Sequence, residues 1–223
     1  MPKTAGMTRR KREVEIPIED SQSIRASLTV PPNARGVIAF AHGSGSSRFS
    51  PRNQFVAGAL NEAGFATLLA DLLTPVEDEL DRQTGSLRFD IGLLSSRFGA
   101  AACWLRNRQR LRELPMGYFA ASTGAAAALI AAADEPAWVS SIVSRGGRPD
   151  LASERLREVR APVLLIVGER DTQVLDLNRT ALHRLNAASR LSVVPRATHL
   201  FEEPSTLDEV VSLTLAWFSA HTA

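Results

Sequence analysis

Short apolar runs that alternate with helix-favouring segments constrain this chain more than any other feature of its sequence. Residues 36–41, 65–70 and 162–167 are almost unbroken apolar runs, and each one ends in a polar turn. Runs of this length without regular polar alternation are typical of strands that are buried on both faces. Because segments with helical periodicity separate the runs, we expect the strands to be parallel and to be linked by crossover helices.

The same pattern predicts further strands and a sheet of about eight strands in total. These strands cover residues 13–18, 23–30, 118–120, 139–143 and 191–194. The first two alternate apolar and polar residues, so they are expected to open the sheet as a pair. The fold class that follows is α/β, with a mostly parallel central sheet flanked by helices on both faces.

Two connecting segments carry expectations of their own. Ser50 and Pro51 are residue types favoured at a helix N-cap and first turn, so a helix should begin there and end near Gly64. Residues 72–86 are acidic and show no apolar periodicity. We therefore expect a loop or short excursion over the sheet there, which would form only a minimal lid.

Length and charge point to one domain with a basic tail. The chain has 223 residues, of which 44% are hydrophobic, and this suits a single compact domain. Lys3, Arg9, Arg10, Lys11 and Arg12 fall in the first twelve residues, where there is no acidic residue. Without these five, 21 basic residues face 24 acidic ones, so the rest of the chain has a balance of −3. We interpret residues 1–12 as a flexible basic tail and residues 13–223 as the folded domain.

The composition also indicates which partners and which cellular location are to be expected. No apolar run reaches transmembrane length, and the N-terminus lacks the apolar region of a secretory signal. A cytoplasmic protein is therefore expected. The excess of arginine over lysine, together with abundant alanine, favours a bacterial source. A short basic tail is more often solvating than a binding element, so no nucleic acid and no membrane partner is expected. The chain is expected to be a monomer or a homodimer.

Ser122 is the leading candidate for a nucleophile. It follows a β-prone apolar run and precedes an alanine-rich segment, residues 124–133, that strongly favours helix. A sharp strand-to-helix turn lifts such a side chain clear of the backbone. The same turn aims the first free N–H groups of the helix at whatever the hydroxyl attacks.

The carboxyl ends of parallel strands meet at one edge of a sheet, where ligands gather. A serine hydroxyl needs a base to remove its proton and a carboxylate to orient that base. Ser122, Asp171 and His199 supply these roles in the chain order associated with a nucleophile elbow. Six candidates follow the ends of predicted strands: His42, Asp71, Ser122, Arg145, Asp171 and His199.

The turn after residues 36–41 is the expected site of one oxyanion donor. The backbone N–H groups of Ser44 and Thr123 are the predicted pair. His42, in the same turn, is a weaker rival as the base. We expect its ring to bond loop backbone and to border the substrate. Asp71 and Asp176 are the rivals for the acid.

Two arginines have no place in this triad. Arg145 and Arg148 bracket a Gly-Gly pair just after a predicted strand. One guanidinium at this place would clamp a carboxylate or a phosphate of the substrate through two hydrogen bonds. An equally good alternative is an ion pair with Asp150 or Glu169 that holds the turn.

These motifs resemble the α/β-hydrolase superfamily and, within it, the dienelactone-hydrolase-like branch. The resemblance covers nearly the whole chain, from about residue 13 to residue 221. Ala120 replaces the first glycine of the usual Gly-x-Ser-x-Gly elbow, and the residue at the nucleophile position is Ser122, whereas dienelactone hydrolases proper use cysteine. The matching motifs are His-Gly-Ser-Gly-Ser-Ser at 42–47, Ala-Ser-Thr-Gly at 121–124, Gly-Glu-Arg-Asp at 168–171 and Ala-Thr-His-Leu-Phe at 197–201.

The function that these residues and the resemblance imply is hydrolysis of a small ester, lactone or thioester through an acyl-enzyme. No metal and no organic cofactor is implied, and the partner is a small-molecule acyl substrate. Two alternatives stay open: a non-catalytic binding protein with the hydrolase fold, and an acyltransferase that uses the same triad. The resemblance also includes relatives joined to a phosphoribosyltransferase domain, which suggests such a protein as a partner in trans.

Overall fold

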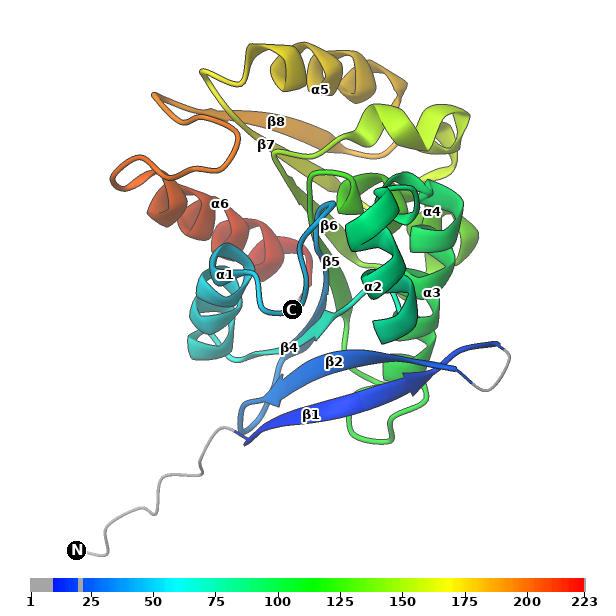
Figure 1. The fold of residues 1–223 in the computed structure, drawn as a ribbon. Coiled ribbons are helices and arrows are strands. Elements are labelled where there is room, and N and C mark those ends of the chain that lie inside the picture. Colours follow the sequence, from blue (N-terminus) through cyan, green and yellow to red (C-terminus); the bar gives the residue numbers. More distant parts are fainter. Residues whose placement is uncertain (1–9, 20–21, 223) are drawn as a thin grey trace, which may run out of the picture.

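A computed structural model describes residues 10–19 and 22–222 of the chain and gathers their strands into one twisted sheet (Figure 1). Buried apolar residues fill the central strands, as expected for strands that are covered on both faces. The eight strands are β1 (Arg10–Pro17), β2 (Ser23–Val30), β3 (Gly36–Ala41), β4 (Phe65–Ala70), β5 (Met116–Ala121), β6 (Ser141–Arg145), β7 (Val163–Gly168) and β8 (Ser189–Val194).

The order of the strands confirms the predicted mostly parallel sheet. The order is β1-β2-β4-β3-β5-β6-β7-β8, and β4, β3, β5, β6, β7 and β8 all run parallel. Strands β1 and β2 are an antiparallel pair, and β2 is also antiparallel to β4. The carboxyl ends of β3, β5, β6, β7 and β8 therefore lie along one edge.

Helices cover both faces of the sheet (Figure 1). Helices α1 and α6 pack on one face, and α3, α4 and α5 pack on the other. Neighbouring residues of β5 show the division, because Phe119 lies in the core on the α1 side and Tyr118 lies in the core on the α3 side. The helices are α1 (Pro51–Glu62), α2 (Pro75–Thr84), α3 (Ile91–Arg106), α4 (Gly124–Asp134), α5 (Thr172–Arg184) and α6 (Thr206–His221), with short 3-10 segments at Leu87–Phe89, Pro136–Trp138 and Pro149–Glu158.

The first helix begins as predicted. Ser50 is its N-cap, and the Ser50 hydroxyl accepts a hydrogen bond from the N–H of Asn53 at 3.4 Å. Strand β1, by contrast, begins at Arg10, before the predicted start of the domain at residue 13. Arg10, Lys11 and Arg12 pair with the end of β2, so this part of the expected basic tail is a strand. Residues 1–9 lie outside the described residues.

The acidic segment 72–86 is not a loop but contains α2, so the prediction of an aperiodic excursion is wrong. The apolar periodicity is missing because Asp81 is the one residue of α2 that is fully buried. Capping interactions at its N-terminus stabilise the helix instead. Thr74 and Glu77 form a reciprocal capping box, with hydrogen bonds of 3.2 and 2.7 Å, and Pro75 occupies the first turn.

Asp81 fastens α2 to the segment that follows it. Its carboxylate accepts the N–H groups of Leu87 and Arg88 at 2.8 and 2.9 Å and the guanidinium of Arg88 at 2.7 Å. Burial by itself would raise the pKa of Asp81, but these hydrogen bonds outweigh it and hold the pKa below its usual value.

Among the described residues, no helix combines the length and the apolar character needed to cross a membrane.

Replacing Asp81 by asparagine should loosen α2 at neutral pH. The variant loses a charged acceptor of several hydrogen bonds, so amide hydrogen exchange in α2 should become about tenfold faster. Because the pKa of Asp81 is lowered on folding, its contribution is present above the unfolded value and is lost as the pH falls through the folded pKa. Exposed Glu79→Gln is the matched control, and equal exchange in both variants would contradict the assigned role.

Candidate active site

Ser122 occupies a strained turn between β5 and α4. Its φ is +50°, a region that non-glycine residues seldom adopt. Two backbone hydrogen bonds secure the turn. The Ser122 N–H donates to the carbonyl of Arg145 at 3.4 Å, and the Ser122 carbonyl accepts the N–H of Arg148 at 3.0 Å. The end of β6 and the turn after it therefore hold the predicted nucleophile.

Two glycines give this turn its space. A Cβ on Gly124 would lie 2.3 Å from the carbonyl oxygen of His42. A Cβ on Gly43 would lie 2.8 Å from the Cβ of Ser122. Both distances are too short for a side chain, so these glycines are required by close approach. Ala120, which replaces the first glycine of the usual elbow, is an ordinary buried residue of β5, and its methyl group fits the core.

His199 and Asp171 are joined by a short hydrogen bond. The distance from His199 Nδ1 to Asp171 Oδ2 is 2.6 Å. Asp171 follows β7 and His199 follows β8, as the sequence predicts. Because a carboxylate can only accept, the proton of this bond belongs to Nδ1, which leaves Nε2 free as an acceptor. The arrangement suits a general base.

The turn after β6 also brings His199 toward the elbow. Gly146 packs against the imidazole, since a Cβ at this position would lie 3.5 Å from both Nδ1 and Cε1 of His199. Gly146 directly follows Arg145, whose carbonyl holds Ser122. Within residues 10–19 and 22–222, the hydroxyl of Ser122 has no hydrogen bond, so its link to His199 is not formed in this structure. Catalytic hydrogen bonds are often long before substrate binds.

His42 is a structural bridge between two loops. Its Nε2 accepts the N–H of Leu72 at 3.1 Å, so Nδ1 carries the proton and donates to the carbonyl of Gly43 at 2.9 Å. Burial lowers the pKa of His42 and favours this neutral ring. Both nitrogens are used by backbone groups, so His42 has none left for proton transfer or for a substrate.

The predicted oxyanion donors lie next to each other. The N–H of Ser44 donates to the hydroxyl of Thr123 at 2.9 Å. The N–H of Thr123 has no acceptor in the described part of the chain. The Thr123 N–H is therefore free. The Ser44 N–H is occupied by the Thr123 hydroxyl, which accepts its hydrogen bond as a substrate oxygen would.

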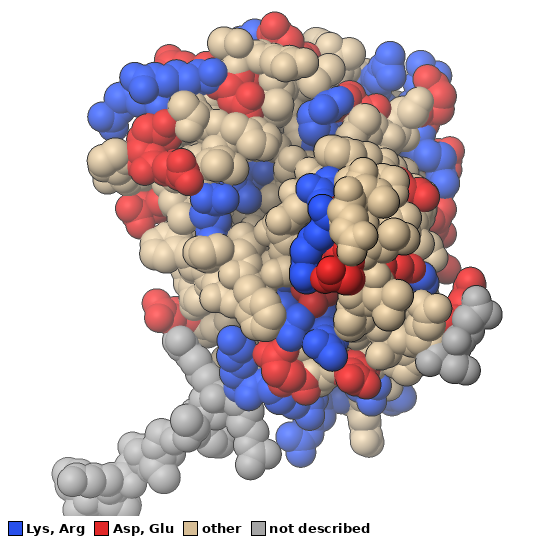
Figure 2. All heavy atoms as spheres, in the orientation of Figure 1, with Lys and Arg blue, Asp and Glu red and all other residues tan. Residues whose placement is uncertain are grey.

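A cavity of about 680 Å³ adjoins this turn, on the side of α2. Its lining includes the loop from His42 to Pro51, the residues after β4, and one side of α2. Figure 2 shows basic and acidic side chains interleaved over this face, with basic side chains along the hollow beside α2. Ser122, Asp171 and His199 do not line the cavity. It reaches the elbow through Gly43, which touches Ser122.

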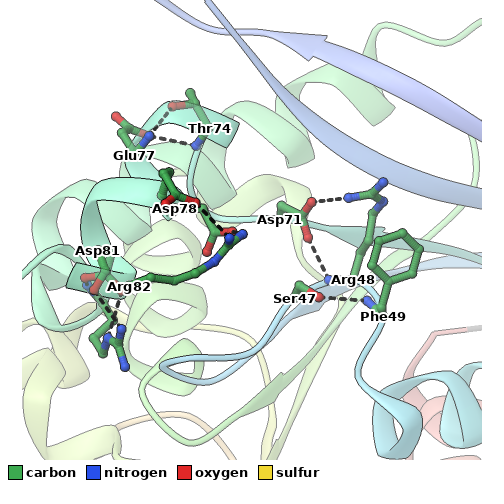
Figure 3. Close-up of polar contacts among 11 residues, drawn as sticks. Ser47, Arg48, Phe49, Asp71, Thr74, Glu77, Asp78, Asp81 and Arg82 are labelled. Atoms are coloured by element: carbon green, nitrogen blue, oxygen red, sulfur yellow. Dashed lines mark hydrogen bonds and ion pairs between the residues drawn. The ribbon is translucent and has the colours of Figure 1, made fainter. Parts of the chain in front are cut away.

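The charged groups of the cavity are paired with one another. Arg48 binds Asp71 through its guanidinium and, at 2.7 Å, through its backbone N–H. On α2, Arg82 pairs with Asp78 at 2.5 Å (Figure 3). The cavity wall is thus locally neutral, and Asp71 is committed to Arg48 rather than available as the triad acid.

Of the other candidates, Asp176 for the triad acid and Arg148 for substrate binding both have partners within the protein. Asp176 is an exposed residue of α5 and pairs with Arg179 at 2.9 Å. Arg148 makes two hydrogen bonds of 2.8 Å with Asp150, which is the arrangement that holds the turn. Arg145 differs from Arg148, because it is buried and has no acidic partner among the described residues.

Within those residues no group of three or more His, Cys, Asp and Glu side chains is placed to hold a metal ion.

The sheet order, the strained serine turn and the His–Asp pair at the strand ends define an α/β-hydrolase fold. The chain is 49% identical to a dienelactone hydrolase from Anabaena variabilis, whose structure it matches with a TM-score of 0.94 over 96% of this chain and 99% of that one. The chain belongs to the dienelactone-hydrolase-like branch of the α/β-hydrolase superfamily. Est1E from Butyrivibrio proteoclasticus shares the fold, with a TM-score of 0.79 over 93% of this chain and 98% of that one at 15% identity.

A second relative is a longer protein, and its name refers to a different activity. A Mycobacterium tuberculosis protein, named provisionally as a phosphoribosyl transferase, is 52% identical over 212 residues, which are 95% of this chain and 47% of that protein. The chain thus spans about half the length of this relative. No family model matches the chain.

Sequence reasoning missed two kinds of residue at this site. The need for Gly43 arises from backbone packing between distant segments, which no local pattern records. The capping signal of α2 was readable, since Thr74, Pro75 and Glu77 stand in the spacing of a capping box.

Adding a methyl group at Gly43 should displace the nucleophile. The Gly43→Ala side chain would meet Ser122 at 2.8 Å, and a displacement of about 1 Å costs roughly 100-fold in rate. The rate of labelling by a fluorophosphonate measures the effect. Gly58→Ala in α1 is the matched control, because a Cβ there meets nothing within 4 Å. Labelling of Gly43→Ala at the control rate would contradict the close approach.

Proposed function

We propose that the protein is a serine hydrolase that cleaves a small ester, lactone or thioester through an acyl-enzyme intermediate. The observation that carries the proposal is the 2.6 Å bond between Asp171 and His199, at the same sheet edge as the strained Ser122 turn. A carboxylate-oriented imidazole beside a serine elbow is the arrangement that activates a hydroxyl group.

The reaction would proceed in two steps. Ser122 Oγ attacks the carbonyl carbon while His199 Nε2 takes the hydroxyl proton, and the positive imidazole is stabilised by Asp171. The same Nε2 then gives the proton to the departing alcohol or thiol, which leaves an acyl group on Ser122. A water molecule repeats the attack in the second step, with its proton passing through His199, and releases the acid and the free serine.

The backbone around the elbow supports stabilisation of the intermediate. The Thr123 N–H is available for the oxyanion. The Ser44 N–H becomes available when the hydroxyl of Thr123, which now accepts it at 2.9 Å, rotates away or is displaced by the substrate oxygen. Two donors that converge on one oxygen atom form an oxyanion hole, and each such donor is worth roughly 100-fold or more in rate.

The adjoining cavity suits a small substrate. Its volume, about 680 Å³, lies within the usual range of small-molecule sites. Its wall combines serine hydroxyls with Phe49, Leu72 and Leu94. The serine at the elbow distinguishes the chain from hydrolases with a cysteine nucleophile, so dienelactone itself is not carried over as the substrate.

A fluorophosphonate should label the protein on Ser122 and should leave Ser122→Ala unlabelled. Mass spectrometry of the intact protein and its peptides measures both results. Ser212→Ala, on α6, is the control and should label at the rate of the unmodified protein. Labelling that persists in Ser122→Ala would place the nucleophile elsewhere, and absence of labelling in the unmodified protein would favour a binding protein.

Asp171→Asn should lower kcat for a short-chain ester by roughly 10,000-fold, because the imidazole loses the carboxylate that sets its tautomer and stabilises its charge. Asp176→Asn, five residues further along the chain and within α5, is the matched control and should retain full activity. Stopped-flow or steady-state ester hydrolysis provides the measurement. Equal losses in the two variants would remove Asp171 from the triad.

A further inference from the structure

Arg145 lies beside the candidate catalytic groups but has no part in the triad. It is the last residue of β6, and its carbonyl holds the N–H of Ser122. The next residue, Gly146, packs against the ring of His199. The backbone of Arg145 therefore belongs to the turn that holds Ser122 and, through the next residue, contacts His199.

The guanidinium of Arg145 is buried without a partner. Only 6% of the residue is exposed, and none of its nitrogens takes part in a hydrogen bond or an ion pair with the described residues. Its Cζ atom lies over the ring of Phe201, 5.7 Å from the ring centroid. Arg48, Arg88 and Arg97, which are partly buried, all bind carboxylates. A buried cation without an anion is costly, and it persists in proteins mainly where function needs it.

Arg52 adds a second positive charge near the guanidinium of Arg145. It stands in the first turn of α1, which has no acidic residue, and it pairs with exposed Glu202 at 3.1 Å. Burial, together with the positive charge of Arg52, lowers the pKa of Arg145 to about 10. Because Glu202 pairs with Arg52, the surplus of positive charge among these three side chains is the unpaired guanidinium of Arg145.

We propose that Arg145, assisted by Arg52, forms an anion subsite beside Ser122 and His199 that binds a carboxylate group of the substrate. The proposal rests on the serine hydrolase function and specifies its substrate class as carboxylate-bearing esters, lactones or thioesters. A carboxylate carries one negative charge, which matches the surplus, and its two oxygens match the planar donors of a guanidinium. A phosphate, with its charge of about −1.5 to −2, would exceed the surplus.

A pair of esters tests the subsite through kinetics. The hexanoate ester and the adipate half-ester of one nitrophenol have acyl groups of equal length, and only the second has a carboxylate. In Arg145→Gln, the ratio of kcat/KM for the adipate half-ester to that for the hexanoate ester should fall at least about tenfold, because a charge-assisted bond is lost. Arg179→Gln, which removes an exposed arginine from α5, should leave the ratio unchanged.

Binding of anions tests the subsite without catalysis. In Ser122→Ala, acetate should raise the midpoint of thermal unfolding, and adding Arg145→Gln should abolish this shift. In buffer without acetate, Arg145→Gln should unfold at the same temperature as the unmodified protein or higher, since an unpaired buried charge has been removed. A purely structural arginine would instead lower that temperature and leave the ester ratio unchanged.

The outcomes separate the two proposals. If the unmodified protein hydrolyses neither ester, the serine hydrolase function fails, while the acetate shift still tests the subsite. If both esters are hydrolysed and Arg145→Gln changes neither the ratio nor the acetate shift, the subsite is wrong. A thermal shift with inorganic phosphate and none with acetate would overturn the assignment to a carboxylate.

Discussion

The backbone turn at Ser122 depends on close approach between segments that are distant in the chain. Gly43 and Gly124 leave no space for a methyl group, and the end of β6 holds the turn through a hydrogen bond to the carbonyl of Arg145. A serine at φ +50° costs free energy, and the surrounding sheet maintains it. Because β5, β3 and β6 are neighbours in one parallel sheet, the constraint on Ser122 is a constraint on the whole sheet order.

Polar contacts around this turn divide into two groups with different consequences. Most charged side chains near the cavity are paired, as Arg48 is with Asp71, so they stabilise loops and leave little net field. The guanidinium of Arg145 is the exception, because it is buried and binds no carboxylate of the described residues. The guanidinium lies over the ring of Phe201, two residues beyond His199, and its burial strengthens electrostatic interactions with any anion that reaches it. The proposed anion subsite and the His–Asp pair therefore meet through the turn after β6, where Gly146 packs against His199.

Much of the candidate site could be predicted because parallel sheets gather their strand ends. Asp171 and His199 were placed by the turns that follow two apolar runs, and their 2.6 Å bond confirms that these turns meet. Ser44 and Thr123 were also placed together, but the bond between them was not foreseeable, since it depends on the rotamer of one hydroxyl group. Helix α2 was missed because capping and ion pairs, rather than an apolar face, stabilise it.

The sequence by itself determined the alternation of strands and helices, the order of Ser122, Asp171 and His199 along the chain, and the edge of the sheet at which they lie. These features depend on local apolar periodicity and on the handedness of crossover connections, both of which act along the chain. Only the tertiary structure decided that His42 bonds backbone through both nitrogens, that Arg148 pairs with Asp150, and that Arg145 is buried without a partner. Partners and burial depend on which distant segments come into contact, and no local pattern in the sequence records those contacts.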